Sequence, residues 1–181
     1  MSQNKPPLLT RHFSAVTLDQ SAELAKATAE LVMAWLSQPS MQTHGVRVWL
    51  RGGLGAGKTT WVRSFLGQCG ITGRIKSPSF SVVESYEHGG LTFHHIDFYR
   101  QSEPSTWQSA GLRDVISDRA VTLIEWPERA EGLPLPHIDI AIDWPLDTEA
   151  SGPRQITMTF FDRTDGPGLE PLLRTWADRW P

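Results

Sequence analysis

The sequence predicts a single α/β domain in which a central mixed β-sheet is flanked by helices. Three observations lead to this fold class. Short runs rich in β-branched and aromatic residues alternate with segments of helical apolar periodicity. A glycine-rich segment joins one such run directly to the helix that follows it. The chain has 181 residues, with 39% apolar and 20% charged side chains, which suits one domain with one core.

The N-terminal part is expected to hold a tail, a strand and a long helix. Residues 1–10 predict a flexible tail, and residues 11–16 predict an edge strand. Thr17 and Gln20 have the spacing of a capping box, which starts a helix. The apolar positions of this helix end before Pro39 and are Leu24, Leu31, Val32, Trp35 and Leu36.

A β-rich run at 46–50 leads into the glycine-rich segment, and a helix is predicted from Lys58 to Leu66, with Gly67 closing it. Beyond a loop at 70–79, the pattern predicts five strands and two helices. The strands are 81–86, 91–99, 120–124, 137–142 and 155–161. The helices run from Pro104 to about Ile116 and over 169–180. The pair Gly89-Gly90 separates the first two of these strands and predicts a hairpin.

The glycine-rich segment matches the Walker A pattern Gly-x-x-x-x-Gly-Lys-Thr over residues 52–59. Glycines let consecutive backbone N–H groups turn toward a phosphate chain without Cβ clashes. The helix that begins at Lys58 directs the positive end of its dipole to the same place. The Lys58 ammonium suits the β- and γ-phosphates, and the Thr59 hydroxyl suits Mg²⁺. The segment therefore predicts a P-loop NTPase-like domain that binds a nucleoside triphosphate with Mg²⁺ through Leu54, Gly55, Ala56, Gly57, Lys58, Thr59 and Thr60.

Two acidic residues stand where apolar strands end. Glu125 follows the run 120–124, which is the Walker B arrangement of a buried strand that carries one carboxylate to the metal. Asp97 interrupts the strand-like run 91–99 in the same way. A lone acid at a strand end is as often solvated or a helix cap. The residues alone therefore leave the role of each carboxylate open.

The base is expected to be adenine. Guanine-specific GTPases use an Asn-Lys-x-Asp motif, and the one Asn of this chain, Asn4, precedes the P-loop. Small-molecule kinases also use P-loops, and the arginines available to clamp a second phosphoryl group are Arg100, Arg113, Arg119 and Arg129. Those side chains suit a solvated surface equally well. A small-molecule kinase is thus an alternative, as is a nucleotide-sensing interaction module with negligible catalysis.

Four further blocks follow the Walker A segment in a characteristic order. With residues 54–60, they are Lys76–Val83, His95–Arg100, Gly111–Asp114 and Ile124–Glu128. Over about residues 14–144 they resemble the TsaE (YjeE) family, the small bacterial ATPases of threonylcarbamoyladenosine synthesis on tRNA. A Walker A pattern alone is shared by many families. The blocks specific to this family are Ser-Pro-[Ser/Thr]-Phe, Asp-[Phe/Leu]-Tyr-Arg and Glu-Trp-Pro.

The resemblance implies roles for the polar residues of these blocks. Lys58 and Thr59 would hold the phosphates and Mg²⁺. Asp97 and Glu125 would match the two acids that hold metal or orient water. On this basis Lys58, Asp97 and Glu125 are expected to be catalytic. Thr59, Asp97 and Glu125 are expected to serve the metal.

Other positions follow from the same resemblance. Ser77–Ser81 would match a switch-like loop over the γ-phosphate, and Trp126 would match a tryptophan beside the nucleotide. Gln20 falls where the family places an adenine contact. The chain departs from the pattern in two places. Gly53 stands where an acidic residue is usual, and Ser79 stands where Thr is commoner.

The family implies a protein that binds and hydrolyses ATP, slowly when alone. It would be required for threonylcarbamoylation of adenosine 37 in tRNA, acting on a complex of TsaD with TsaB rather than transferring the group itself. We expect residues 11–145 to form the P-loop ATPase domain. Residues 146–181 are expected to add a strand and a helix packed on the same domain.

Composition limits the partners. The formal charge of −3 lacks the basic surplus of a nucleic-acid binder, so tRNA is expected to be reached only indirectly, through the protein partners. Cys69 is the one cysteine, which excludes an intrachain disulfide and favours a reducing compartment. Residues 1–7 lack the apolar core of a signal peptide, and no apolar run approaches the ~20 residues of a membrane span. We expect a cytoplasmic protein without membrane contact.

Overall fold

The computed structural model describes residues 6–41, 44–75, 78, 82–101, 103–108, 111–117, 119–145, 152–163 and 168–180. The strands in these ranges are β1 (Leu9–Val16), β2 (Val46–Arg51), β3 (Val83–His88), β4 (Leu91–Asp97), β5 (Ala120–Glu125), β6 (Ile138–Asp143) and β7 (Arg154–Phe160). The helices are α1 (Leu18–Leu36), α2 (Lys58–Gln68), α3 (Leu112–Ser117) and α4 (Glu170–Ala177). Short 3₁₀ turns cover Pro39–Met41, Thr106–Gln108 and Pro127–Arg129.

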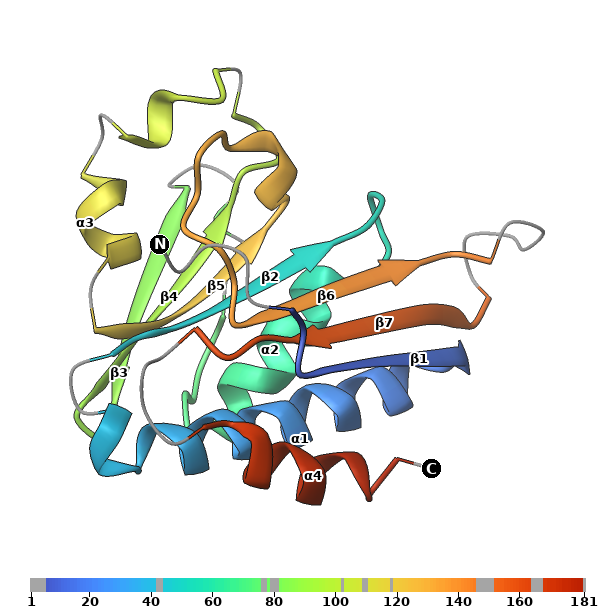
Figure 1. Cartoon of the computed structure of the whole chain (residues 1–181). Helices are drawn as coiled ribbons and strands as arrows, with labels where there is room; N and C mark the ends of the chain where they lie inside the picture. Colours follow the sequence, from blue (N-terminus) through green and yellow to red (C-terminus); the bar gives the residue numbers. More distant parts are fainter. Residues whose placement is uncertain are drawn as a thin grey trace.

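The strands form one sheet in the order β1-β7-β6-β2-β5-β4-β3. The pairs β2–β5, β2–β6 and β4–β5 are parallel, and the outer pairs are antiparallel, so the predicted mixed sheet is confirmed. Parallel strands end at the same edge of a sheet. The segments that follow β2, β4 and β5 therefore meet at one edge, which is where open α/β sheets bind ligands (Figure 1).

The two faces of the sheet are covered differently. Figure 1 shows α1, α2 and α4 on one face and α3 beside the β4–β5 half of the other. Side chains of β2 point alternately to the two faces of the sheet. Val48 and Leu50 enter the larger apolar core on one face, and Trp49 enters the smaller core on the other. Most of the eight tryptophans are packing residues. The buried ones are Trp35, Trp49, Trp61, Trp107 and Trp176.

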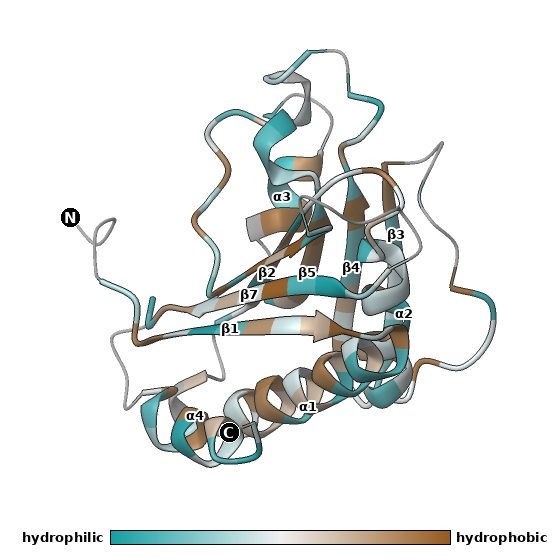
Figure 2. Cartoon of the chain, turned by 90° about the vertical axis from the view of Figure 1, so that its right-hand side faces the viewer, coloured by the Kyte–Doolittle hydropathy of each residue, from teal (hydrophilic) through white to brown (hydrophobic). Residues whose placement is uncertain are grey.

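The capping box predicted for α1 is present. The Thr17 hydroxyl accepts a hydrogen bond from the Gln20 amide, and the Gln20 side-chain oxygen accepts one from the Thr17 amide. Figure 2 shows α1 and α4 side by side below the edge of the sheet that β1 and β7 form. Trp176 of α4 packs there against Phe160 of β7, with ring centroids 4.9 Å apart. The residues after 145 thus complete the larger core.

Two helix predictions need correction. The single helix expected from Pro104 to Ile116 is instead a 3₁₀ turn and the short α3, because Gly111 between them has a φ of 73° that a helix cannot contain. The α2 helix also runs through Gly67 to Gln68. Its closing left-handed residue is Gly70, with a φ of 89°.

Some boundaries also differ. β1 begins at Leu9, inside the expected tail, because Leu9 and Thr10 pair with β7; residues 1–5 of that tail lie outside the described residues. β4 ends at Asp97 rather than at residue 99, because the Asp97 carboxylate accepts the Tyr99 amide and turns the chain. None of the helices in the described ranges is both long and apolar enough for a bilayer crossing.

Candidate functional site

The P-loop is placed by close backbone packing. It joins β2 to α2, and Gly52 at its start has a φ of 131°. A Cβ atom at Gly52 would lie 2.0 Å from the Ile142 carbonyl oxygen in β6, so this position requires glycine for space as well as for conformation. Gly57, the residue before α2, has a φ of 112°. At Gly53, in contrast, a Cβ would meet no atom within 4 Å, so the loop has room for the acidic residue that is usual there.

The start of α2 offers amide groups to an anion. The first backbone hydrogen bond of this helix runs from the Trp61 amide to the Gly57 carbonyl, at 2.9 Å. The amides of Lys58, Thr59 and Thr60 therefore have no acceptor within the helix. Together with the helix dipole, they form the kind of site that binds phosphate.

Lys58 is a buried cation at the mouth of the P-loop. Its ammonium donates to the carbonyl oxygens of Gly52 and Gly53, both at 2.8 Å, and lies 3.9 Å from the centre of the Trp126 ring. Burial lowers the pKa of Lys58, while the carboxylates of Glu125 and Asp97 act in the opposite direction. These contacts hold the ammonium beside the helix N-terminus.

Glu125 lies at the end of β5 with both carboxylate oxygens engaged. Its Oε2 accepts the Thr59 hydroxyl at 3.0 Å, and its Oε1 lies 2.8 Å from Nε2 of His95. Glu125 is 2% exposed and His95 is fully buried. Because two contacts on separate elements fix this carboxylate, its orientation toward the P-loop is set before any ligand arrives.

Asp97 lies directly beside Glu125, because the two residues pair across the parallel strands β4 and β5. Burial raises the pKa of the Asp97 carboxyl, and the neighbouring Glu125 carboxylate adds to the rise. The Tyr99 amide, at 2.9 Å from Oδ1, acts against it. Two carboxylates in adjacent register repel each other, and a divalent cation between them would relieve that repulsion.

Trp126 forms a wall of the site and also packs against the smaller apolar core. The residue is half-buried, has a φ of 57°, and donates its amide to the Leu50 carbonyl of β2. One face of the ring contacts the Lys58 ammonium, and the Tyr99 ring lies 5.0 Å away, centroid to centroid. The guanidinium of Arg129 lies over both aromatic rings.

These residues enclose a cavity of about 620 Å³. Its lining comes from the P-loop and the start of α2, from the segment before β3, and from the ends of β4 and β5 with the residues that follow them: Leu54, Gly55, Gly57, Lys58, Thr59, Thr60, Pro78, Val82, Asp97, Tyr99, Arg100, Gln101, Glu125 and Trp126. The structure thus brings most of the predicted site residues together. In the described parts of the chain, no three His, Cys, Asp or Glu side chains converge as a metal cage.

A family model described as "Threonylcarbamoyl adenosine biosynthesis protein TsaE" matches residues 17–156. The chain belongs to the TsaE family. The "tRNA threonylcarbamoyladenosine biosynthesis protein TsaE" of Haemophilus influenzae is 40% identical over 98 residues, which are 54% of this chain and 61% of that protein. The Bacillus subtilis protein of the same name is 35% identical over 138 residues, or 76% and 80% of the two chains.

A solved structure agrees with this assignment. The crystal structure of Bacillus subtilis YdiB superposes with a TM-score of 0.62 at 28% identity, covering 94% of this chain and 95% of that one. The predicted α/β fold with a mixed sheet flanked by helices is thereby confirmed.

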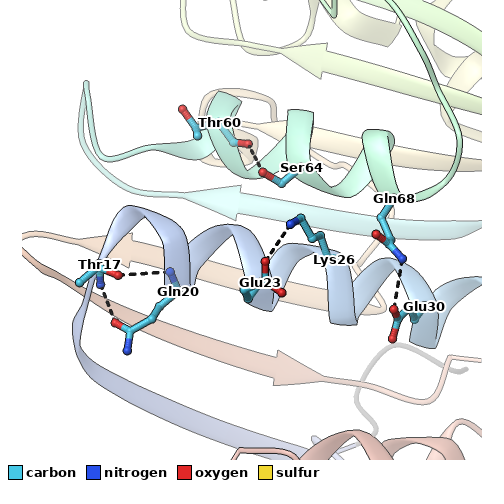
Figure 3. Close-up of polar contacts among 8 residues, drawn as sticks. All are labelled: Thr17, Gln20, Glu23, Lys26, Glu30, Thr60, Ser64 and Gln68. Atoms are coloured by element: carbon cyan, nitrogen blue, oxygen red, sulfur yellow. Dashed lines mark hydrogen bonds and ion pairs between the residues drawn. The ribbon is translucent and has the colours of Figure 1, made fainter.

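Two residues predicted for TsaE-type nucleotide binding lie outside the cavity lining. Ala56 is buried, and its carbonyl faces Arg154. Gln20 is held in the capping box, and Figure 3 shows it at the first turn of α1, next to the first turn of α2 where Thr60 lies. An adenine contact by Gln20 stays a prediction. Of the predicted switch-like loop Ser77–Ser81, only Pro78 lies within the described residues, and it lines the cavity.

Sequence reasoning on this TsaE-family chain missed three site residues. His95 stands in the same block as Asp97, and its strand position two residues earlier was the available signal, because i and i+2 share a sheet face. Tyr99 stands in the same block, just before Arg100, and its ring meets that of Trp126. Arg154 carries no local signal, since its P-loop partner is 98 positions away in sequence.

Proposed function

We propose that this TsaE-family protein binds ATP with Mg²⁺, hydrolyses it, and uses the reaction to support threonylcarbamoylation of tRNA in the cytoplasm. The observation that carries the proposal is the convergence of Lys58, Thr59 and Glu125 around the N-terminus of α2. The names of the relatives support the tRNA step. The acceptor complex is proposed to be TsaD with TsaB, and the acidic balance favours contact with tRNA through those partners.

The chain's residues suit in-line attack of water on a γ-phosphate. The amides of Lys58, Thr59 and Thr60 and the Lys58 ammonium would stabilise the charge that spreads over the phosphate oxygens. On nucleotide binding, the ammonium would exchange its contacts with the two loop carbonyls for contacts with phosphate oxygens, because the phosphates would lie in the same loop. Thr59, Glu125 and Asp97 would hold Mg²⁺, which supplies further positive charge to the β- and γ-oxygens. One of the two carboxylates would orient the attacking water.

Lys58→Ala tests the site. We expect ATP hydrolysis to fall by about tenfold or more, because an ammonium that stabilises transition-state charge is lost. Lys26→Ala is the matched control, since Lys26 is an exposed lysine on α1 that pairs with Glu23. Phosphate release should be measured with and without the TsaD–TsaB complex. Equal turnover in the Lys58 variant and the wild type would contradict the assignment of the site.

A small-molecule kinase is the second candidate, favoured by Arg100 and Gln101 in the cavity lining. An arginine beside the γ-phosphate position is a suitable clamp for an acceptor's phosphoryl group. Labelled ATP incubated with a metabolite panel separates the two. Label on a small acceptor supports the kinase, whereas free phosphate that rises with TsaD–TsaB supports the ATPase. Partner affinity that responds to ATP without turnover above background would indicate a nucleotide-sensing module instead.

A further inference from the structure

A buried arginine lies behind the P-loop. Arg154 is the first residue of β7 and is 8% exposed. It pairs with Val16 at the end of β1, next to the start of α1. Burying a guanidinium is costly unless hydrogen bonds and ring contacts compensate. The contacts that Arg154 makes therefore indicate its role in the structure.

One of these contacts reaches a peptide of the loop, and the others hold the guanidinium in place. Nε of Arg154 donates to the Ala56 carbonyl at 2.9 Å, and the same Nε would lie 3.6 Å from a Cβ at Gly57. Its Nη1 donates to the Gly152 carbonyl at 3.3 Å, and its guanidinium carbon lies 4.4 Å from the centre of the Trp144 ring. The guanidinium is thus held in place by the β6 and β7 ends and presses on the Ala56–Gly57 peptide.

The geometry of a peptide unit gives this contact a consequence. In a trans peptide the C=O and the following N–H point in opposite directions. A hydrogen bond that fixes the Ala56 carbonyl on Arg154 therefore turns the Gly57 amide away from Arg154. Gly55 and Gly57 both have positive φ. Because glycine has no Cβ, this stretch is free to adopt other orientations unless a contact fixes it.

We infer that Arg154 is a positioning residue for phosphate: it holds the Ala56–Gly57 peptide so that the Gly57 N–H is presented to the phosphate chain. The inference rests on the proposed nucleotide binding and adds a residue that lies outside the Walker A segment. A loop whose amide is already oriented loses less conformational freedom on binding, so the affinity for the phosphates is higher.

Arg163 provides a matched control. It follows β7 at its other end, its Nε donates to the Pro136 carbonyl at 3.3 Å, and its guanidinium carbon lies 4.6 Å from the centre of the Phe161 ring. The two contacts described for it are of the same kind as those of Arg154, and neither involves a residue of the P-loop. The test compares Arg154→Met and Arg154→Lys with Arg163→Met in the full-length chain.

Calorimetry with Mg²⁺-ADP should show about tenfold weaker binding for Arg154→Met, the factor expected for one lost charge-assisted hydrogen bond. Arg154→Lys should lose about threefold, because an ammonium lacks the planar fork that meets both carbonyls. Arg163→Met should bind within about twofold of the wild type. In ¹H–¹⁵N spectra, the Gly57 amide should move on ADP binding in the wild type and move less in both Arg154 variants.

The outcomes are separable. A wild type that gives no heat with Mg²⁺-ADP contradicts the proposed function itself. If the wild type binds Mg²⁺-ADP and the folded Arg154 variants bind it equally well with the same Gly57 shift, the inference about Arg154 is overturned while the proposed function stands. If Arg154→Met does not fold, Arg154→Lys decides, and wild-type affinity there overturns the inference. A loss of melting temperature equal in the Arg154 and Arg163 variants, without a change in affinity, also counts against it.

Discussion

Among single residues, His95 has the most specific contact with the proposed chemistry. It is fully buried in β4, and its one described side-chain hydrogen bond runs to the carboxylate that also accepts the Thr59 hydroxyl. His95 is not among the residues that line the cavity. Its effect is to fix the direction of the Glu125 carboxylate, which makes it a positioning residue.

His95→Gln and His95→Leu should therefore differ. The glutamine side-chain amide carries an N–H donor that can replace Nε2–H, so kcat for ATP hydrolysis should stay within about threefold of the wild type. Leucine leaves one oxygen of the buried carboxylate without a partner, and kcat should fall by about tenfold or more with little change in nucleotide affinity. His94→Leu is the control, because His94 contacts Ser85 across the hairpin instead. Equal kcat in both His95 variants would contradict the positioning role.

Asp97→Asn should stabilise the nucleotide-free protein while it impairs hydrolysis. The pKa of Asp97 is raised by burial, so the folded protein holds this proton more tightly than the unfolded chain does. The stability that follows is present below the ordinary value of 3.8 and is lost as pH rises through the folded pKa. Asparagine keeps an oxygen for the Tyr99 amide and avoids this loss.

The melting temperature of Asp97→Asn minus that of the wild type should therefore grow with pH above 3.8 and then level off at a few degrees. Hydrolysis that requires Mg²⁺ should drop by about tenfold or more. Asp178→Asn, at an exposed position after α4, should show neither change. A variant less stable than the wild type near pH 7.5 would contradict the burial argument.

At the scale of elements, α1 and α2 set the geometry of the site together. They run side by side in the same direction, and the Gln68 side chain of α2 donates to the Glu30 carboxylate of α1 (Figure 3). The start of α1 is fixed by its capping box, whereas no side chain caps the start of α2, where Gly57 has a left-handed conformation. An uncapped helix start leaves its amides for a ligand, whereas a capped one contributes stability.

Thr17→Ala should thus lower the free energy of unfolding by about 1 kcal/mol, because one orphan amide of α1 loses its acceptor. The melting temperature should fall by roughly 2–4 °C. Ser64→Ala is the comparison, because the Ser64 hydroxyl bonds only to the Thr60 carbonyl one turn earlier within α2. That change should stay within about 0.5 kcal/mol. Equal losses in the two variants would show that the cap contributes nothing.

The end of α2 makes a chemical prediction. Cys69 is buried there, and burial raises the pKa of its thiol to about 12, from an ordinary 9.0. Three pKa units leave about a thousandfold less thiolate near pH 8, so a disulfide reagent should react about that much more slowly with the folded protein than with the unfolded chain. Cys69 is the one thiol present, which makes the absorbance signal unambiguous. Reaction rates of the native and denatured protein within tenfold of each other would contradict this effect of burial on the Cys69 thiol.

For the whole molecule, local patterns predicted what depends on neighbours in sequence. Periodicity located α1, β2 and β5, and the Walker A spacing located the P-loop, because each is encoded within a few consecutive residues. The interruption of the expected helix at Gly111 was not predicted, because a glycine within a helical pattern does not by itself indicate a left-handed conformation. The Gly52–Ile142 approach and the Arg154–Ala56 hydrogen bond depend on strand order, which a single sequence does not contain.

The position of β7 between β1 and β6 also determines when the sheet can be completed during synthesis of the chain. A ribosome delivers β1 first, yet β1 has no partner in the sheet until residues 154–160 have been made. Until then the edges of β1 and β6 both offer unpaired backbone groups, which is when a growing chain is most exposed to association with other chains. Arg154 is made with β7, so the nascent chain acquires its complete sheet and the hydrogen bond from Arg154 to the Ala56 carbonyl in the same late step.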